Sequence, residues 1–237
     1  MNKIPKIVHQ IWSGIDGPLP EHFKILGGTW QRDYPDWEYI LWDKDMMNCF
    51  IKKNYPQYWD IYTRFHYNIQ RWDAIRYLIL DKIGGMYVDF DYESIKPMHE
   101  LIRDKECCFS LEPEIHSPKQ GELFFNNAMM LSVSGHFFMK KIISSVFSEK
   151  TLEYDWRDKG ACIMNTAGPS KLVSLYNELN EEEQRRIYLI PAKYVSPFDR
   201  YQLKSFFDGE RSYDLERSLD NAYAVHYFFN TWVRAIR

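Results

Sequence analysis

The stretch RWDAIRYLILDKIGGMYVDFDYE, residues 71–93, decides the fold. Its first part carries an apolar stripe at helical spacing, formed by Trp72, Ile75, Ile79 and Ile83. This stripe predicts a helix over residues 68–83. Gly84 and Gly85 follow, and glycine at this place is typical of a helix that ends in the left-handed conformation. The next residues, MYVDF, predict a strand that starts directly after the glycines.

Strands and helices alternate on both sides of this stretch. The patterns predict strands at residues 6–12, 38–42, 107–111, 128–133 and 186–190. They predict helices at residues 21–33, 43–54, 56–65, 135–149 and 169–178. Such alternation predicts an α/β fold with a mostly parallel sheet flanked by helices. In sheets of this kind ligands bind beyond the carboxyl ends of the strands, which is where the acidic residues of the central stretch lie.

Length and charge limit the function classes. The chain has 237 residues and no repeat or Gly-, Ser- or Pro-rich linker, which predicts one domain over residues 1–237. Its formal net charge of -3 gives no support to a nucleic-acid partner. Aromatic residues make up 17% of the chain, more than a core requires, and such rings can stack on sugars and bases.

The cysteines and the two ends of the sequence predict a cytoplasmic protein. The 4 cysteines have no CxxC spacing, so they indicate reduced thiols and no structural zinc site. The first residues lack the apolar stretch of a signal peptide, and no run reaches membrane-spanning length. Residues 223–237 mix aromatics with two arginines. We expect this tail to pack on the core, with weak contact to the inner face of a membrane as the alternative.

Asp89 and Asp91 form the strongest candidate for a metal site. On an extended backbone two residues at this spacing point the same way. Mn²⁺ and Mg²⁺ prefer oxygen ligands and commonly bridge one or two carboxylates to substrate phosphates. A metal there would neutralise the charge that develops on a departing diphosphate.

The same spacing occurs at Asp43 and Asp45, so the pattern alone does not identify a site. Here the acidic residues follow a predicted strand and precede a predicted helix. This position is typical of a helix N-cap. The setting of Asp89 and Asp91, after a helix, a glycine stop and a strand, favours a site over a solvated strand end.

Asp73 and Arg76 are three residues apart on the predicted helix and therefore lie on one face of it. An exposed ion pair would account for them. Their closeness to Asp89 also permits a clamp on sugar hydroxyls, in which the carboxylate accepts hydrogen bonds and the guanidinium donates them.

Taken together, the central stretch and IPKIVHQIW, residues 4–12, resemble glycosyltransferase family 32, whose sugar-binding region contains an Asp-x-Asp motif. Three further segments resemble the family: EYILWD at residues 38–43, TAGPSKLV at residues 166–173, and AVHYFFNTW at residues 224–232. The resemblance implies a GT-A fold, a nucleotide-sugar donor, Mn²⁺ or Mg²⁺, and retention of anomeric configuration.

The resemblance also implies roles for individual residues. Trp12 matches an aromatic residue that stacks on the donor base, with a place in the core as the alternative. Asp73 and Arg76 match the pair that grips the donor sugar. Asp89 matches the carboxylate near ribose and metal, and Asp91 matches the one on the metal. These four charged residues are the expected catalytic set.

The remaining matched residues lie later in the sequence. His226 resembles a metal ligand or diphosphate contact, and an interior histidine is the alternative. Trp232 resembles a ring that closes over the phosphates. Asn126, Asn127, Asn165 and Gly168 fall in segments similar to substrate-facing loops, with Asn127 and Gly168 expected to bind the donor.

These matches predict a retaining, metal-dependent hexosyltransferase. We expect UDP-galactose or UDP-glucose as donor and an oligosaccharide or lipid-linked glycan as acceptor, in surface polysaccharide biosynthesis. GDP-mannose as donor, a host-protein acceptor, and a non-catalytic protein that binds nucleotide-sugars or carbohydrates are the alternatives. A metal-dependent hydrolase is disfavoured because the 7 histidines form no HxH or HxxxH cluster.

Overall fold

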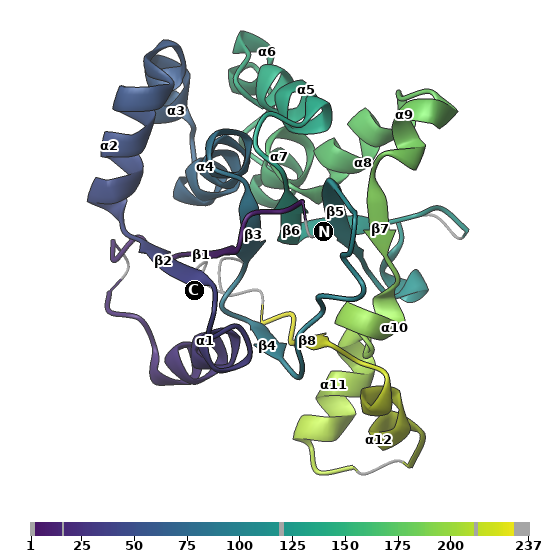
Figure 1. The fold of residues 1–237 in the computed structure, drawn as a ribbon. Coiled ribbons are helices and arrows are strands. Elements are labelled where there is room, and N and C mark those ends of the chain that lie inside the picture. The colour runs from purple at the N-terminus through teal and green to yellow at the C-terminus, as the bar shows by residue number, and fades with distance from the viewer. Residues whose placement is uncertain (1–2, 16, 119–120, 211–212, 230–237) are drawn as a thin grey trace.

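The computed structural model describes residues 3–15, 17–118, 121–210 and 213–229, and its centre is a six-stranded sheet (Figure 1). In spatial order the strands are β2 (Glu38–Trp42), β1 (Ile7–Ile11), β3 (Gly85–Val88), β6 (Phe125–Ser132), β5 (Cys107–Leu111) and β7 (Tyr188–Ile190). Only β6 runs opposite to its neighbours, so five of the six strands point the same way. The predicted mostly parallel sheet of a GT-A fold is confirmed.

A second, two-stranded sheet holds the C-terminal segment beside the acidic residues. It pairs β4 (Tyr92–Ser94) with β8 (Ala224–His226) in antiparallel register, with His226 opposite Tyr92. This pairing holds the C-terminal segment around His226 beside Tyr92, which directly follows Asp91.

Helices cover both faces of the large sheet (Figure 1). The layer above the sheet in this view contains α2 (Lys44–Asn54), α3 (Trp59–Arg64), α4 (Asn68–Lys82), α5 (Phe137–Val146), α6 (Glu149–Leu152), α7 (Lys159–Thr166), α8 (Pro169–Asn177) and α9 (Glu181–Arg185). The opposite side contains α1 (Glu21–Asp33), α10 (Ala192–Val195), α11 (Arg200–Phe207) and α12 (Tyr213–Asp220). Two short 3₁₀ helices, Pro56–Tyr58 and Glu114–His116, complete the elements. Within the described ranges, no helix has the length and apolar character needed to cross a bilayer.

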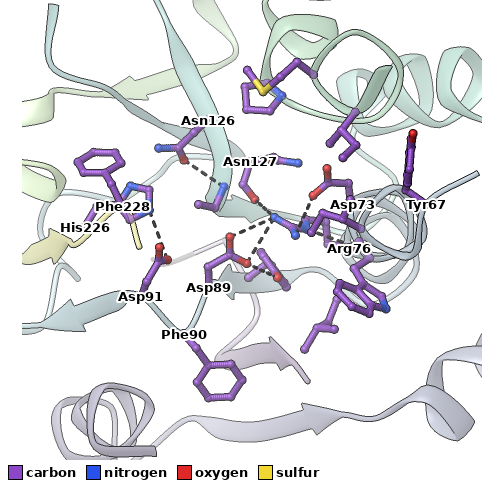
Figure 2. Close-up of a pocket in the computed structure, with 18 of the residues that line it drawn as sticks. Tyr67, Asp73, Arg76, Asp89, Phe90, Asp91, Asn126, Asn127, His226 and Phe228 are labelled. Atoms are coloured by element: carbon purple, nitrogen blue, oxygen red, sulfur yellow. Dashed lines mark hydrogen bonds and ion pairs between the residues drawn. The ribbon is translucent and has the colours of Figure 1, made fainter. Parts of the chain in front are cut away.

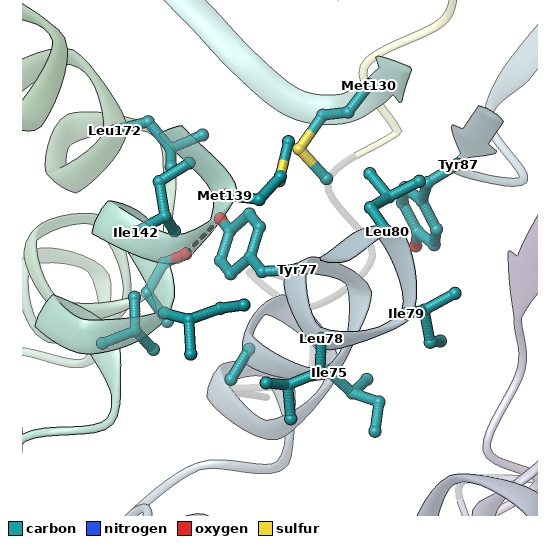
Figure 3. Close-up of a cluster of buried hydrophobic side chains, with 14 of the residues drawn as sticks. Ile75, Tyr77, Leu78, Ile79, Leu80, Tyr87, Met130, Met139, Ile142 and Leu172 are labelled. Carbon is teal, nitrogen blue, oxygen red and sulfur yellow. Dashed lines mark hydrogen bonds between the residues drawn. The ribbon is translucent and has the colours of Figure 1, made fainter. Parts of the chain in front are cut away.

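Helix α4 is buried on every side, whereas its sequence predicts one apolar stripe. Ile75, Tyr77, Leu78, Ile79 and Leu80 are all inaccessible to solvent, so side chains around the whole helix are covered (Figure 3). The Tyr77 hydroxyl donates a hydrogen bond to the Ala167 carbonyl at 2.6 Å. The sequence predicts too narrow a buried face for α4. The helix is covered on more sides because it lies between the sheet and an outer layer formed by α5, α7 and α8. Each fully buried aliphatic side chain of this kind contributes about 1.5–3 kcal/mol.

The strand after the glycines is shorter than predicted. It ends at Val88, and the chain then turns, with the Tyr92 amide donating to the Asp89 carbonyl at 3.2 Å. Asp89 and Asp91 therefore lie on a turn and not on extended backbone.

The glycine pair that ends α4 has the left-handed backbone conformation that the sequence predicts. Gly84 and Gly85 have φ values of +76° and +103°, and a Cβ at Gly85 would lie 2.7 Å from the Ile7 carbonyl oxygen. Only glycine permits both the left-handed backbone and this close approach of β1.

Candidate active site

A cavity of about 800 Å³ lies beyond the carboxyl ends of β1 and β3. Trp12 and the turn after β3 form one part of its wall, α4 forms another, and β6 and β8 close it. Eight of the predicted site residues line it: Trp12, Asp73, Arg76, Asp89, Asp91, Asn126, Asn127 and His226. The fold thus gathers most of the candidates into one space.

Arg76 is at the centre of a buried charge network (Figure 2). Its guanidinium lies 2.9 Å from the Asp73 carboxylate and 3.4 Å from that of Asp89, and it donates to the Asn127 carbonyl at 2.7 Å. The side chains of Arg76 and Asp73 are only 4% and 7% exposed. The alternative of an exposed surface ion pair is therefore wrong.

Burial raises the pKa values of two carboxylates in this network. It brings the pKa of Asp73 to about 7, although the positive charge of Arg76 acts in the opposite direction. Burial also raises the pKa of Asp89, again against Arg76, and the nearby charge of Asp91 adds to the rise. The Tyr87 hydroxyl donates to Asp89 at 2.5 Å and holds the carboxylate in place.

Asp91 has different partners and the opposite pKa shift. Its carboxylate lies 3.3 Å from His226 Nε2 and accepts a hydrogen bond from the Phe229 amide at 3.1 Å. Burial alone would raise the pKa of Asp91, but His226 and these hydrogen bonds outweigh it, so the pKa falls below its ordinary value. The backbone carbonyl of Asp91 also accepts from the Tyr227 amide at 2.8 Å. Asp91 is therefore ionised and joined to the segment after β8.

His226 is both buried and part of the cavity wall. Its ring stacks on Tyr92 with centroids 4.1 Å apart and an interplanar angle of 10°. Burial lowers the pKa of His226, and the charge of Asp91 more than compensates, so the pKa is raised. Its Nδ1 atom is buried and has no hydrogen-bond partner among the residues that the structure describes. Its assignment as a metal ligand stays a prediction.

The donor set suits a hard cation. Asp89 and Asp91 supply carboxylate oxygens to the same cavity, which Mn²⁺ and Mg²⁺ favour. In the described part of the chain, no three His, Cys, Asp or Glu side chains form a group that could hold a metal alone. Mg²⁺ commonly binds through one or two carboxylates and completes its shell with water and substrate phosphates, so the two carboxylates fit that mode.

Trp12 lies on the cavity wall at the end of β1. Its indole N–H donates to the Gly17 carbonyl at 2.9 Å, and its ring packs edge-on against Phe90 with centroids 6.3 Å apart. Phe23 contacts the same ring at 5.8 Å. Trp12 is half-buried, Phe23 and Phe90 are buried, and all three line the cavity, while the role of Trp12 in stacking on a base stays a prediction.

The two asparagines of β6 are held firmly. The Asn127 amide donates to the Tyr77 hydroxyl at 2.9 Å, and the Asn126 amide donates to Glu112 at 3.2 Å. Both asparagines are buried in the cavity wall.

Three predicted residues do not join this group. Gly168 is buried and does not itself line the cavity, although the adjacent Pro169 does; a Cβ at Gly168 would lie 2.9 Å from the Ile163 carbonyl oxygen, so glycine here permits the close packing of α7 against α8. Asn165 is exposed and donates to the Ala161 carbonyl within its own helix. Trp232 lies outside the described residues.

Several residues of the cavity were missed by sequence reasoning. His116 Nδ1 lies 2.8 Å from the Glu112 carboxylate in the wall, and His66, Tyr67 and Lys159 also line the cavity. These residues come from loops and helix starts without a local motif, so no signal in the sequence could have identified them.

The family description "Glycosyltransferase sugar-binding region containing DXD motif" matches residues 20–108. The chain is 34% identical to mannosyl phosphorylinositol ceramide synthase SUR1 of Saccharomyces cerevisiae over 74% of this chain and 42% of that protein. It is 37% identical to inositol phosphoceramide mannosyltransferase 1 of Schizosaccharomyces pombe over 43% of this chain and 32% of that protein. The chain thus spans less than half the length of these relatives.

Among solved structures, the fold is similar to that of PaToxG glycosyltransferase. The TM-score is 0.55 at 13% sequence identity, and the match covers 93% of this chain and 89% of that one. At this identity the similarity concerns the fold alone.

The expected cytoplasmic localisation, at the inner membrane face or away from it, is contradicted by the relatives. They are named for the mannosylation of inositol phosphoceramide, a membrane lipid, and not for a cytoplasmic activity. The reduced cysteines and the N-terminal residues were therefore a poor basis for assigning a compartment.

Proposed function

The chain belongs to the glycosyltransferase family whose sugar-binding region contains the DXD motif, and on that premise we propose that it transfers mannose from GDP-mannose to a hydroxyl group of a glycolipid. The acceptor class that we propose is an inositol phosphoceramide. The mannosyltransferase names of the relatives support this donor over the UDP-hexose that the sequence favoured. The buried Arg76 network beside Asp91 is the observation that supports catalysis.

Each part of the cavity has a proposed task in binding the donor. Trp12 stacks on the guanine base, while Asp73 and Arg76 bind hydroxyls of the mannose. Asn127 fixes the guanidinium of Arg76 through its carbonyl, so the arginine is already oriented before the donor binds. Asp89 and Asp91 hold Mn²⁺ or Mg²⁺, which supplies positive charge for the diphosphate when it is bound.

The proposed transfer retains the configuration of the donor carbon. No residue in this cavity has been identified as a nucleophile that could form a covalent intermediate. We therefore propose that the acceptor hydroxyl attacks from the side of the leaving group and gives its proton to the departing phosphate oxygen. Positioning and charge stabilisation by the cavity residues lower the barrier.

A binding protein without turnover is the second candidate. A buried arginine with two carboxylates is costly to keep in a protein interior, and hydrophobic residues of similar volume often stabilise a fold equally well or better. A simple carbohydrate-binding module has no need of this network. The network therefore favours a catalytic task.

The test is a transfer assay with Mn²⁺, inositol phosphoceramide in detergent micelles, and one of three donors: GDP-mannose, UDP-glucose or UDP-galactose. We expect a mannosylated lipid from GDP-mannose and no product from either UDP-sugar. Product from a UDP-hexose alone would reject the donor. GDP binding without either transfer or donor hydrolysis would favour the binding protein.

A further inference from the structure

The turn that carries Asp89 and Asp91 has a third residue, Phe90, between the two carboxylates. Figure 2 shows its ring on the opposite side of the turn from the Asp89 and Asp91 carboxylates. The side chain of Phe90 is buried. The proposed binding of cation, nucleotide and sugar gives this ring no task of its own. A buried ring between two candidate metal ligands is in a place to fix the position of both.

Helix α1 forms the surface on which this ring rests. Gly27 lies in the middle of α1, and a Cβ at this residue would lie 2.8 Å from Cε1 of Phe90. Two carbon atoms in favourable contact are about 3.5–4.0 Å apart, so a side chain here would collide with the ring. Glycine in the interior of a helix is less stable than alanine. The missing side chain of Gly27 is therefore the space that the ring of Phe90 needs.

Other side chains enclose Phe90 from further directions. Trp12 packs edge-on against it with ring centroids 6.3 Å apart, and the centroid of Phe23 lies 6.2 Å from that of Phe90. The side-chain oxygen of Gln10 would lie 2.9 Å from the same Cβ at residue 27. A side chain at residue 27 would thus meet a ring that is already packed on several sides, and the turn that carries the ring would have to move.

The backbone is held on both sides of the turn. Before it, the Gln10 side-chain amide donates to the Val88 carbonyl at 3.3 Å, directly ahead of Asp89. After it, the Trp30 indole N–H donates to the Tyr92 carbonyl at 3.0 Å. Trp30 belongs to α1, one turn of helix beyond the glycine on which the ring rests. Strand β1 and helix α1 therefore fix the two ends of the turn, and the buried ring fixes its middle.

We propose that Phe90 is a positioning residue for the cation site, and that its contact with Gly27 sets where the Asp89 and Asp91 carboxylates lie. Displacement of the ring moves the backbone between the two carboxylates and weakens their joint hold on the cation. Phe90 thus acts through the two carboxylates and not by its own contact with the cation. The inference rests on the proposed function in treating Asp89 and Asp91 as the residues that hold Mn²⁺ or Mg²⁺.

Two adjacent glycines provide a matched pair for the experiment, which measures Mn²⁺ binding by electron paramagnetic resonance without nucleotide. Asp91→Asn identifies the part of the binding that belongs to this site. Gly27→Ala should raise the dissociation constant of that part about tenfold or more, as is usual when the support of a metal ligand is disturbed. Gly28 is exposed, and a Cβ there would meet nothing within 4 Å. Gly28→Ala should keep the wild-type dissociation constant and raise the melting temperature by about 2–4 °C, because alanine is the better helix former.

A compensating substitution tests whether the contact itself is responsible. Phe90→Leu alone should weaken Mn²⁺ binding, because the turn loses its packed ring. Leucine also makes room for a side chain at residue 27, so the double variant Gly27→Ala/Phe90→Leu should bind Mn²⁺ more tightly than Gly27→Ala alone. Melting temperatures show that binding is measured on folded protein. If Gly27→Ala does not fold by itself, a folded, Mn²⁺-binding double variant supports the contact, and a double variant that does not recover overturns it.

Equal dissociation constants of the wild type and Gly27→Ala, or losses that multiply in the double variant, would also overturn the positioning role. The readout contains no nucleotide and no sugar transfer, so either result leaves mannose transfer standing. Conversely, a wrong donor in the transfer assay does not alter the comparison of Mn²⁺ binding. A wild type that binds no Mn²⁺ at Asp91 would overturn both the cation site and the role of Phe90.

Discussion

Asp43-Lys44-Asp45 and Asp89-Phe90-Asp91 have the same spacing, yet they differ in almost every physical respect. Asp43 is exposed at the start of α2, where its carboxylate accepts a hydrogen bond from the Met46 amide at 2.8 Å. Asp89 and Asp91 lie in a cavity, with Arg76 and His226 as their charged partners. The difference teaches that the surroundings of an Asp-x-Asp pattern, and not its spacing, decide between a helix cap and a site.

The two patterns are physically connected through His9. The Trp42 indole N–H donates to His9 Nδ1 at 3.2 Å, and His9 Nε2 lies 2.9 Å from the Gly84 carbonyl. Trp42 directly precedes Asp43, and Gly84 precedes the strand that leads to Asp89. The ring of His9 therefore joins the two segments that lead to the two patterns.

The largest expected effect is on the transfer rate, and it distinguishes substitutions in the two Asp-x-Asp patterns. Asp91→Asn should lower mannose transfer by about a thousandfold or more, because the carboxylate that would hold the cation on the diphosphate is lost. Asp45→Asn, in the exposed pattern, should leave the rate unchanged. Steady-state transfer rates at saturating GDP-mannose measure both. Comparable losses in the two variants would remove the distinction.

The next effect concerns stability. Arg76→Met leaves Asp73 and Asp89 buried without their cation, and we expect a loss of about 3–5 kcal/mol in the free energy of unfolding. The matched control is Arg64→Met, which removes the exposed ion pairs with Asp60 and Glu149 and should leave the free energy of unfolding nearly unchanged, because solvent screens such pairs. Urea denaturation of both variants gives the comparison. A loss of under 1 kcal/mol for Arg76→Met would show that the network is not buried as described.

The connection through His9 predicts a pH dependence. Burial lowers the pKa of His9 from 6.5 to about 4, because a charged ring loses its hydration there, and the hydrogen bond with the Gly84 carbonyl opposes this shift only in part. The unfolded chain binds a proton at about pH 6.5 and the folded one does not. The stability contributed by neutral His9 is therefore present above pH 6.5 and decreases as the pH falls from 6.5 to 4, by about 3 kcal/mol in total.

Unfolding free energies of the wild type and His9→Gln between pH 4 and 8 test this dependence. The variant should be less stable at pH 8, with a smaller decrease toward pH 4. If the free energies of unfolding of the two proteins decreased by the same amount between pH 8 and pH 4, His9 would not be the source of the pH dependence.

The smallest effect belongs to the cap. Asp43→Ala should lower the stability by about 1 kcal/mol, because the Met46 amide loses its acceptor, and should leave transfer by the folded protein unchanged. Asp43→Asn keeps a side-chain oxygen and should be nearly neutral. Thermal unfolding of the pair measures the difference. A loss of transfer by folded Asp43→Ala would give this pattern a part in the site.

Much of the fold follows from local signals in the sequence. The α1 helix and strand β2 have the predicted bounds, and α2 begins after the predicted cap Asp43. Gly84 and Gly85 mark the true junction between α4 and β3. These features depend on neighbouring residues, so the sequence contains what is needed to predict them.

Features that depend on distant segments were not predicted. The opposite direction of β6 and the burial of residues 73–80 of α4 on every side result from how the layers assemble, which periodicity alone does not report. The turn at Asp89 forms where β4 pairs with β8, more than 130 residues later. For the same reason the charged and aromatic residues near Asp91 were found by resemblance, while Glu112 and His116 were missed.

The central claim is that Asp89 and Asp91 hold a cation that receives the diphosphate of the donor. Its most direct test is the melting temperature of the wild type, Asp91→Asn and Asp45→Asn with GDP, with and without Mn²⁺, because a ligand that binds the folded state raises this temperature. We predict a Mn²⁺-dependent rise for the wild type and Asp45→Asn and none for Asp91→Asn. An equal Mn²⁺-dependent rise in Asp91→Asn would contradict the claim.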